Sequence, residues 1–99
     1  MNPKIDEAAA KDLKDLLARV NRLLDKGDIV GARAIYQRAA EFGSGAAALA
    51  LGATYDPNRL WSLGALGLVG NRERARQWYL RASELGQSEA KDRLTALGF

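Results

Sequence analysis

The sequence contains no cysteine and no histidine, and it has only two prolines among 99 residues. Without cysteine, neither a disulfide nor thiolate chemistry is possible, and this absence suits the cytoplasm and the periplasm equally. Without histidine, the chain lacks the commonest general base and the commonest metal ligand. No apolar run approaches the roughly 18 residues of a membrane span. The N-terminal MNPKIDEAAAKD has no apolar signal region.

Length and composition predict a single helical domain over residues 1–99. Apolar residues make up 47% of the chain and charged residues 27%, which is typical of a globular domain and not of a disordered one. Alanine is abundant and β-branched residues are few, a balance that favours helices. The net charge is +3, from 15 basic and 12 acidic residues interspersed along the chain.

The most informative feature present is an internal repeat. Residues 27–43 read GDIVGARAIYQRAAEFG and residues 70–86 read GNRERARQWYLRASELG, with identical residues at 8 of 17 aligned positions. Glycine, alanine and tyrosine shared at helical spacings, 43 residues apart, indicate stacked helix pairs. Such units present surfaces and rarely perform chemistry. The sequence therefore predicts a kind of protein and not a particular partner.

Apolar periodicity and capping residues divide the chain into five main helices and one short helix. In the first helix, leucines and a valine recur at spacings of one and three and draw a single apolar stripe. Asp28 and Ser44 are placed to cap the next two helices, and Gly27 and Gly43 to end the preceding ones. Asp56-Pro57 predicts the start of the short helix. The expected helices span residues 6–26, 28–42, 45–55, 57–63, 71–85 and 88–97.

Three of these segments carry more specific expectations. The third helix, GAAALALGATY, is apolar almost all round, which predicts a central position with neighbours on more than one side. We expect the apolar loop LGALGLVG, at residues 63–70, to press onto the core. In the last helix we expect an apolar edge of Ala90, Leu94 and Leu97 and an exposed edge of Glu89, Lys91, Asp92 and Arg93.

The repeat resembles a known group of helical proteins. GDIVGARAIYQRA is similar to the turn and second helix of a tetratricopeptide repeat. The middle of the chain resembles the related Sel-one-like repeat, through Ala47, Leu51-Gly52, Tyr55, Gly67-Leu68, Asn71, Arg74-Ala75, Trp78-Tyr79, Ala82-Ser83 and Gly86. An insertion within Asp56–Leu66 lengthens one turn of that pattern. The resemblance covers residues 12–98 and implies an all-α fold, in which antiparallel helix hairpins stack as a short α-solenoid (an α–α superhelix).

The spacing also predicts how paired helices meet. Ala47, Leu51 and Tyr55 are four residues apart and line one helix face, opposite a stripe of Ala75, Tyr79 and Ala82. Gly52 removes a side chain where the paired helix crosses. We expect the large rings of Tyr36 and Trp78 to fill the wedge between successive units.

Nothing in the chain predicts catalysis or a cofactor. Asp12, Asp15 and Asp25 have the spacing of solvated helix positions, and no nucleophile has a base beside it. The glycine-rich GALGLVG lacks the Lys-Ser/Thr of a phosphate-binding loop and follows no strand. No acidic loop has the spacing of a calcium site. We therefore expect a non-catalytic protein that holds neither cofactor nor metal.

The leading expectation is a scaffold or adaptor that binds a protein or peptide partner. The resemblance implies a concave groove built from the first helix of each pair. The candidate partner-binding residues are outward positions of the third helix and of the insertion, namely Leu49, Ala50, Ala53, Arg59, Leu60 and Trp61. Aromatic and arginine side chains are favoured interface anchors. Trp61 is therefore either such an anchor or a lid over the core.

Two alternatives remain open at this stage. If the outer edge of the last helix is poorly covered, two copies could pair there as a structural homodimer. The cluster Arg72, Arg74, Arg76 and Arg81 could bind nucleic acid or another polyanion, with Arg72 and Arg76 on one helical face. Glu73 sits within that cluster, which also fits a solvated helix face.

Overall fold

The computed structural model describes residues 7–64 and 67–99, and every helix in these ranges follows from a pattern in the sequence. The helices are α1 (Glu7–Asp25), α2 (Ile29–Glu41), α3 (Gly45–Tyr55), the 3-10 helix η1 (Leu60–Leu63), α4 (Arg72–Glu84) and α5 (Glu89–Ala96). No strand occurs in the described part of the chain. The prediction of an all-α protein is confirmed, and most helix ends lie within one or two residues of the expected ones.

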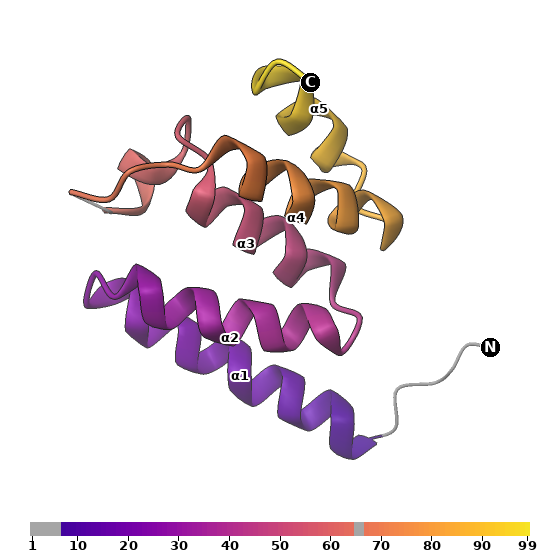
Figure 1. Ribbon diagram of the computed structural model, residues 1–99. Coiled ribbons are helices and arrows are strands. Elements are labelled where there is room, and N and C mark those ends of the chain that lie inside the picture. The colour runs from indigo at the N-terminus through magenta and orange to yellow at the C-terminus, as the bar shows by residue number, and fades with distance from the viewer. Residues whose placement is uncertain (1–6, 65–66) are drawn as a thin grey trace.

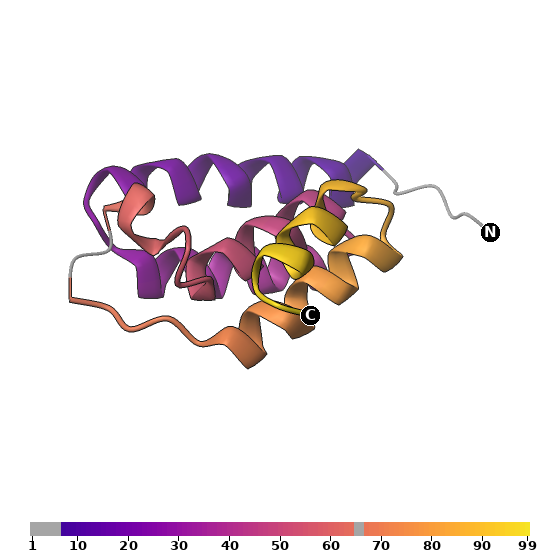
Figure 2. The ribbon, with the colours of Figure 1, turned by 90° about the horizontal axis from the view of Figure 1, so that it is seen from above.

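Consecutive helices pack against each other in chain order. Contacts join α1 to α2, α2 to α3, α3 to α4 and α4 to α5, and the short η1 lies against α3. Figure 1 shows this succession from α1 across the molecule to α5, and Figure 2 shows α1 and α4 on opposite sides of it. The connections after α1, α2 and α4 are short, because a glycine in the left-handed conformation ends each of these helices: Gly27, Gly43 and Gly86, with φ of 76°, 96° and 96°.

The helix starts are capped as the repeat predicts. The Asp28 carboxylate accepts the Gly31 N–H at 2.8 Å, and the Asn71 side-chain oxygen accepts the Arg74 N–H at 3.0 Å. Ser44 does the same for α3 through Ala47. Each cap satisfies one amide that the first helical turn leaves unpaired. Asp28 and Asn71 of the repeat thus cap α2 and α4 in the same way, whereas of the glycines that precede them only Gly27 ends a helix.

Helix α3 occupies the centre, as its apolar composition predicts. Seven of its eleven residues are buried, and it packs between α2 and α4. Its small side chains let α4 come close. A methyl group on Gly52 would lie only 2.5 Å from Cδ1 of Tyr79. The expectation that Gly52 makes room for the crossing helix is confirmed.

The aromatic rings differ more in burial than the repeat predicts. Tyr79 is completely buried, whereas its counterpart Tyr36 is only partly covered. Trp78 and Tyr55 pack against the main core from its edge and are also partly exposed. The difference has a geometric cause, because Tyr79 lies between α3 and α4 at the middle of the stack.

Two expectations about the insertion are wrong. The short helix begins at Leu60 and not at residue 57, because the Asp56 carboxylate accepts the Asn58 N–H at 2.8 Å and holds residues 57–59 in a turn. The loop after η1 is not pressed onto the core at Leu68 and Val69, which are 37% and 87% exposed. Residues 65 and 66 of that loop lie outside the described ranges.

Candidate functional site

A hollow of about 260 Å³ opens where α1, α2, α3, α5 and the insertion meet, with Tyr36 as the lining residue from α2. Its floor comes from one face of α3, with Leu49, Ala50 and Ala53 among the lining residues. Leu24 of α1 and Leu63 of η1 line it as well, and two arginines complete the wall. The side chains of α3 on this face are small or apolar, so the floor is a shallow apolar surface that a second chain can approach.

The opposite face of α3 fixes the shape of that floor. There the Tyr79 ring of α4 packs on Gly52, and its hydroxyl donates to Oδ2 of Asp56 at 2.6 Å. Both side chains are buried. Burial, followed by the hydrogen bond to Asp56 and its negative charge, raises the pKa of Tyr79 well above its usual value. The hydroxyl therefore stays protonated and remains a donor through the physiological range.

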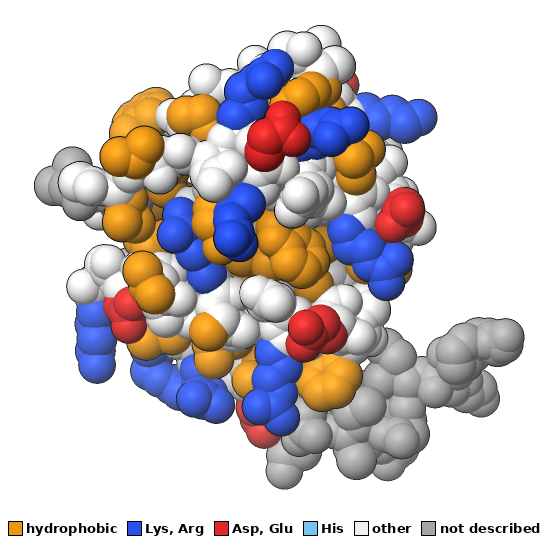
Figure 3. Space-filling model, in the orientation of Figure 1, with side chains coloured by type: hydrophobic (Ala, Val, Ile, Leu, Met, Phe, Trp, Pro, Cys, Tyr) orange, Lys and Arg blue, Asp and Glu red, His pale blue; other side chains and the backbone are white. Residues whose placement is uncertain are grey.

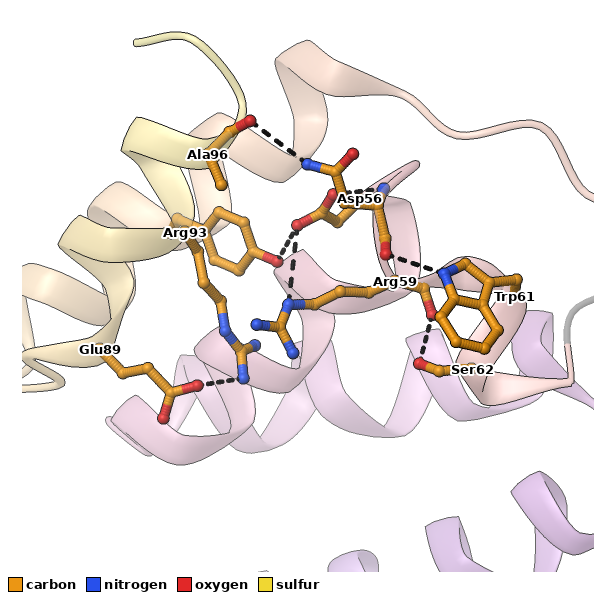
Figure 4. A network of polar contacts seen from close by, with 9 residues as sticks. Asp56, Arg59, Trp61, Ser62, Glu89, Arg93 and Ala96 are labelled. Atoms are coloured by element: carbon orange, nitrogen blue, oxygen red, sulfur yellow. Dashed lines mark hydrogen bonds and ion pairs between the residues drawn. The ribbon is translucent and has the colours of Figure 1, made fainter.

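Asp56 in turn shapes the chain that follows α3. One carboxylate oxygen holds the Asn58 N–H, and the other accepts from Tyr79 and lies 4.0 Å from Nε of Arg59. A buried carboxylate of this kind is retained only with such partners. The turn that carries Arg59 is thereby anchored to the core, as the close view in Figure 4 shows.

The two arginines of the hollow come from opposite sides. Arg59 precedes η1, and Arg93 projects from α5, where it forms an ion pair with Glu89. The Arg93 side chain is only 13% exposed, and its Nε is buried without a hydrogen-bond partner. In Figure 4 the two guanidinium groups point toward one another. Among the described residues that line this hollow, none is Asp or Glu.

The structure brings together four of the six candidate residues. Leu49, Ala50, Ala53 and Arg59 all line the hollow. Leu60 does not, because it is buried against Ile29 under η1. Trp61 also points elsewhere. It is 77% exposed, and its indole N–H donates to the Asn58 carbonyl at 3.2 Å. The alternative that Trp61 is a lid over the core is therefore wrong.

Arg93 is the lining residue that sequence reasoning placed wrongly. It was expected on the exposed edge of the last helix, yet its side chain lies at the hollow. Its position three residues after the buried Ala90 is the signal that could have placed it inward, because residues three apart share a helix face. The positive charge of the Arg93 side chain, taken alone, favours the solvent-exposed edge of the helix.

The arginine cluster of α4 is occupied by contacts within the chain. Nε of Arg72 donates to the Leu97 carbonyl at 2.6 Å, and its guanidinium lies 4.0 Å from the centre of the Phe99 ring. Arg76 forms an ion pair with Glu73 at 3.7 Å. Figure 3 shows basic and acidic side chains spread over this face of the molecule without one continuous basic stripe. The geometry favours a solvated face over a polyanion site.

The outer surface of α5 bears on the homodimer alternative. Lys91, Asp92 and Thr95 are exposed there, whereas Leu97 is 7% exposed. Phe99 is 44% exposed and is partly covered by Arg72 and Arg76. Such a surface is polar, as expected of a helix that ends a stack. Pairing through a bare apolar edge of this helix finds little support.

Other site chemistry has no support in the described residues. No group of three or more potential metal ligands occurs within 7–64 and 67–99. In the same ranges, no helix is both long enough and apolar enough to cross a membrane.

A scan of protein-family models gives no match, and searches of curated proteins and of solved structures give none either. The repeat resemblance therefore rests on the residues that carry it.

Proposed function

We propose that this chain is a non-catalytic interaction module that binds a peptide segment of a partner protein in this hollow. The observation that supports the proposal most is that Leu49, Ala50 and Ala53 of α3 and Arg59 of the insertion, all chosen from the sequence as outward positions, line the same hollow. The tetratricopeptide resemblance assigns the ligand surface to the first helix of each pair, here α1, α3 and α5. These three helices contribute to the lining, and Tyr36 of α2 and residues of η1 complete it.

The proposal includes the repeat architecture. The buried Tyr79 and the half-buried Tyr36 hold the same position in α4 and α2, each four residues after a buried alanine. Helices follow one another side by side, and the molecule measures 38 × 31 × 15 Å. A thickness near that of one or two helices favours a flat stack of hairpins over helices gathered round one central core. Adaptor function is the role that such stacks commonly serve.

The lining of the hollow, more than its size, supports a peptide as the ligand. Sites for cofactors and drug-sized ligands usually enclose about 300–1,000 Å³, and this hollow has about 260 Å³. It accommodates a few side chains. Its lining mixes a small apolar floor with two arginines, a combination of shape and charge found at protein interfaces.

Selection from a phage-displayed library of random octapeptides tests the proposal. We expect selected peptides to bind the protein and to lose binding to Ala50→Trp, which fills the floor of the hollow. The matched control is Ala34→Trp, which places the same ring on an exposed position of α2. Peptides that bind both variants equally well, or failure to select any peptide, would contradict the proposal. Circular dichroism checks that both variants fold.

A further inference from the structure

We propose that the hollow recognises an acidic side chain of the partner peptide, with its carboxylate held between Arg59 and Arg93. This inference rests on the proposed function and deepens it. The partner is thereby defined as a segment with one aspartate or glutamate flanked by small or apolar residues.

The described lining of the hollow carries two basic side chains and no acidic one. The guanidinium groups of Arg59 and Arg93 point toward one another, and both line this hollow. Each has one acidic partner outside this lining, Asp56 for Arg59 and Glu89 for Arg93, and all four residues line a second hollow. Two like charges that face each other across an apolar surface attract an anion between them. A carboxylate can accept from both in the geometry that guanidinium groups favour.

Arg93 is positioned before any ligand arrives, whereas Arg59, at 44% exposure, is only guided by Asp56. Asp56 lies 4.0 Å from Arg59 and is itself fixed by the buried Tyr79 hydroxyl at 2.6 Å. Glu89 pairs with Arg93, whose side chain is 13% exposed. Ordering of flexible side chains normally opposes binding, so groups that are already ordered bind a ligand more tightly.

The remaining wall fits the stem of an acidic side chain better than a peptide terminus. The hydroxyl of Thr54 donates to the Leu51 carbonyl at 2.6 Å, and that of Ser62 donates to the Arg59 carbonyl at 2.8 Å. The Thr54 oxygen also accepts from Nε of Arg33 at 3.2 Å, so of these two hydroxyls only that of Ser62 keeps an acceptor for a peptide N–H. A terminal carboxylate brings a peptide N–H directly beside it, which requires a polar partner. A glutamate carboxylate stands on two methylene groups, which can lie on Ala50.

Nuclear magnetic resonance titration with defined peptides tests the inference. The probes are end-blocked pentapeptides with a central Glu and Ala, Leu or Ser elsewhere, a second pool with Gln in place of Glu, and a third Gln pool with a free C-terminal carboxylate. We expect the Glu pool to shift the side-chain Nε–H signals of Arg59 and Arg93. It should bind at least about tenfold more tightly than either Gln pool, the loss typical of one charged hydrogen-bonded contact.

Matched variants decide whether the arginine pair is responsible. The double variant Arg59→Gln/Arg93→Gln should lose the preference for Glu, while Arg81→Gln should retain it. Arg81 is a suitable control because it is 49% exposed and pairs with Glu84 at 3.3 Å, away from this hollow. Equal binding of Glu and Gln pools, an equal loss in the control, or tightest binding of the free-terminus pool would each overturn the inference. Thermal melts confirm folding.

The two proposals fail in different ways. If octapeptides bind in a manner that Ala50→Trp blocks but show no dependence on Arg59 or Arg93, the hollow binds peptides and the acidic specificity is wrong. If no peptide binding depends on Ala50, the proposed function itself is wrong. The Glu and Gln pools then also bind alike, which overturns the inference as well.

Discussion

Replacement of Gly52 by alanine is the sharpest test of the packing between α3 and α4. The added methyl would lie 2.5 Å from Cδ1 and 2.6 Å from Cε1 of Tyr79. The ring cannot easily retreat, because it is fully buried and its hydroxyl is held by Asp56 at 2.6 Å. Overpacking of a core costs about 1–3 kcal/mol. Contacts this short, on a ring held at both ends, place Gly52→Ala at the upper end of that range.

The helix propensity of alanine opposes this cost. Alanine stabilises a helix interior over glycine by about 1 kcal/mol, so the net loss in free energy of unfolding is about 2 kcal/mol. For a domain of about 100 residues, 1 kcal/mol moves the melting temperature by about 4–8 °C. We therefore expect Gly52→Ala to melt about 10 °C lower when followed by circular dichroism. The same loss should appear in the urea midpoint.

A second substitution separates the clash from other effects of the methyl group. In a Tyr79→Ala background the ring is absent, so Gly52→Ala should no longer destabilise. It should stabilise by up to about 1 kcal/mol through helix propensity alone. The reasoning is refuted if Gly52→Ala melts at or above the temperature of the unmodified protein, or if its cost is the same with and without the Tyr79 ring.

Two further predictions concern Tyr79 and Trp61. Burial and Asp56 raise the pKa of Tyr79 in the folded state. The contribution of its hydroxyl to stability is therefore complete below about pH 10 and is lost as the pH rises above the pKa of an unfolded tyrosine. Between pH 9 and pH 11 the urea midpoint should fall less in Tyr79→Phe than in the unmodified protein, and an equal fall in both proteins would contradict the assignment. Trp61→Ala should change the free energy of unfolding by no more than about 0.5 kcal/mol, because the side chain is 77% exposed; a loss above 2 kcal/mol in a urea titration would show that the indole supports the core.

Sequence reasoning succeeds where the cause is local. Glycines at left-handed turns and the caps Asp28, Ser44 and Asn71 are short-range signals, and each helix boundary that depends on them is close to the expected one. The central place of α3 follows from its composition, because a helix that is apolar almost all round is buried on more than one side. The close approach at Gly52 follows from the same reasoning applied to one residue.

It fails where a side chain has two acceptable environments. Arg93 can extend into water or lie along apolar surface with its charge paired, and helical spacing alone does not choose between them. The structure chooses the second, with Glu89 as partner. Asp56 likewise reads as a helix cap before Pro57, yet the distant Tyr79 hydroxyl and the Asn58 amide take its oxygens. Such choices depend on residues far away in the sequence.

The candidate site and the tightest contact of the core are two faces of one helix. Gly52 and Tyr79 set how closely α4 approaches α3, and the hydroxyl of that ring holds Asp56. Asp56 in turn fixes the turn that presents Arg59 at the hollow. A change at Gly52 therefore reaches the binding surface through a chain of three contacts.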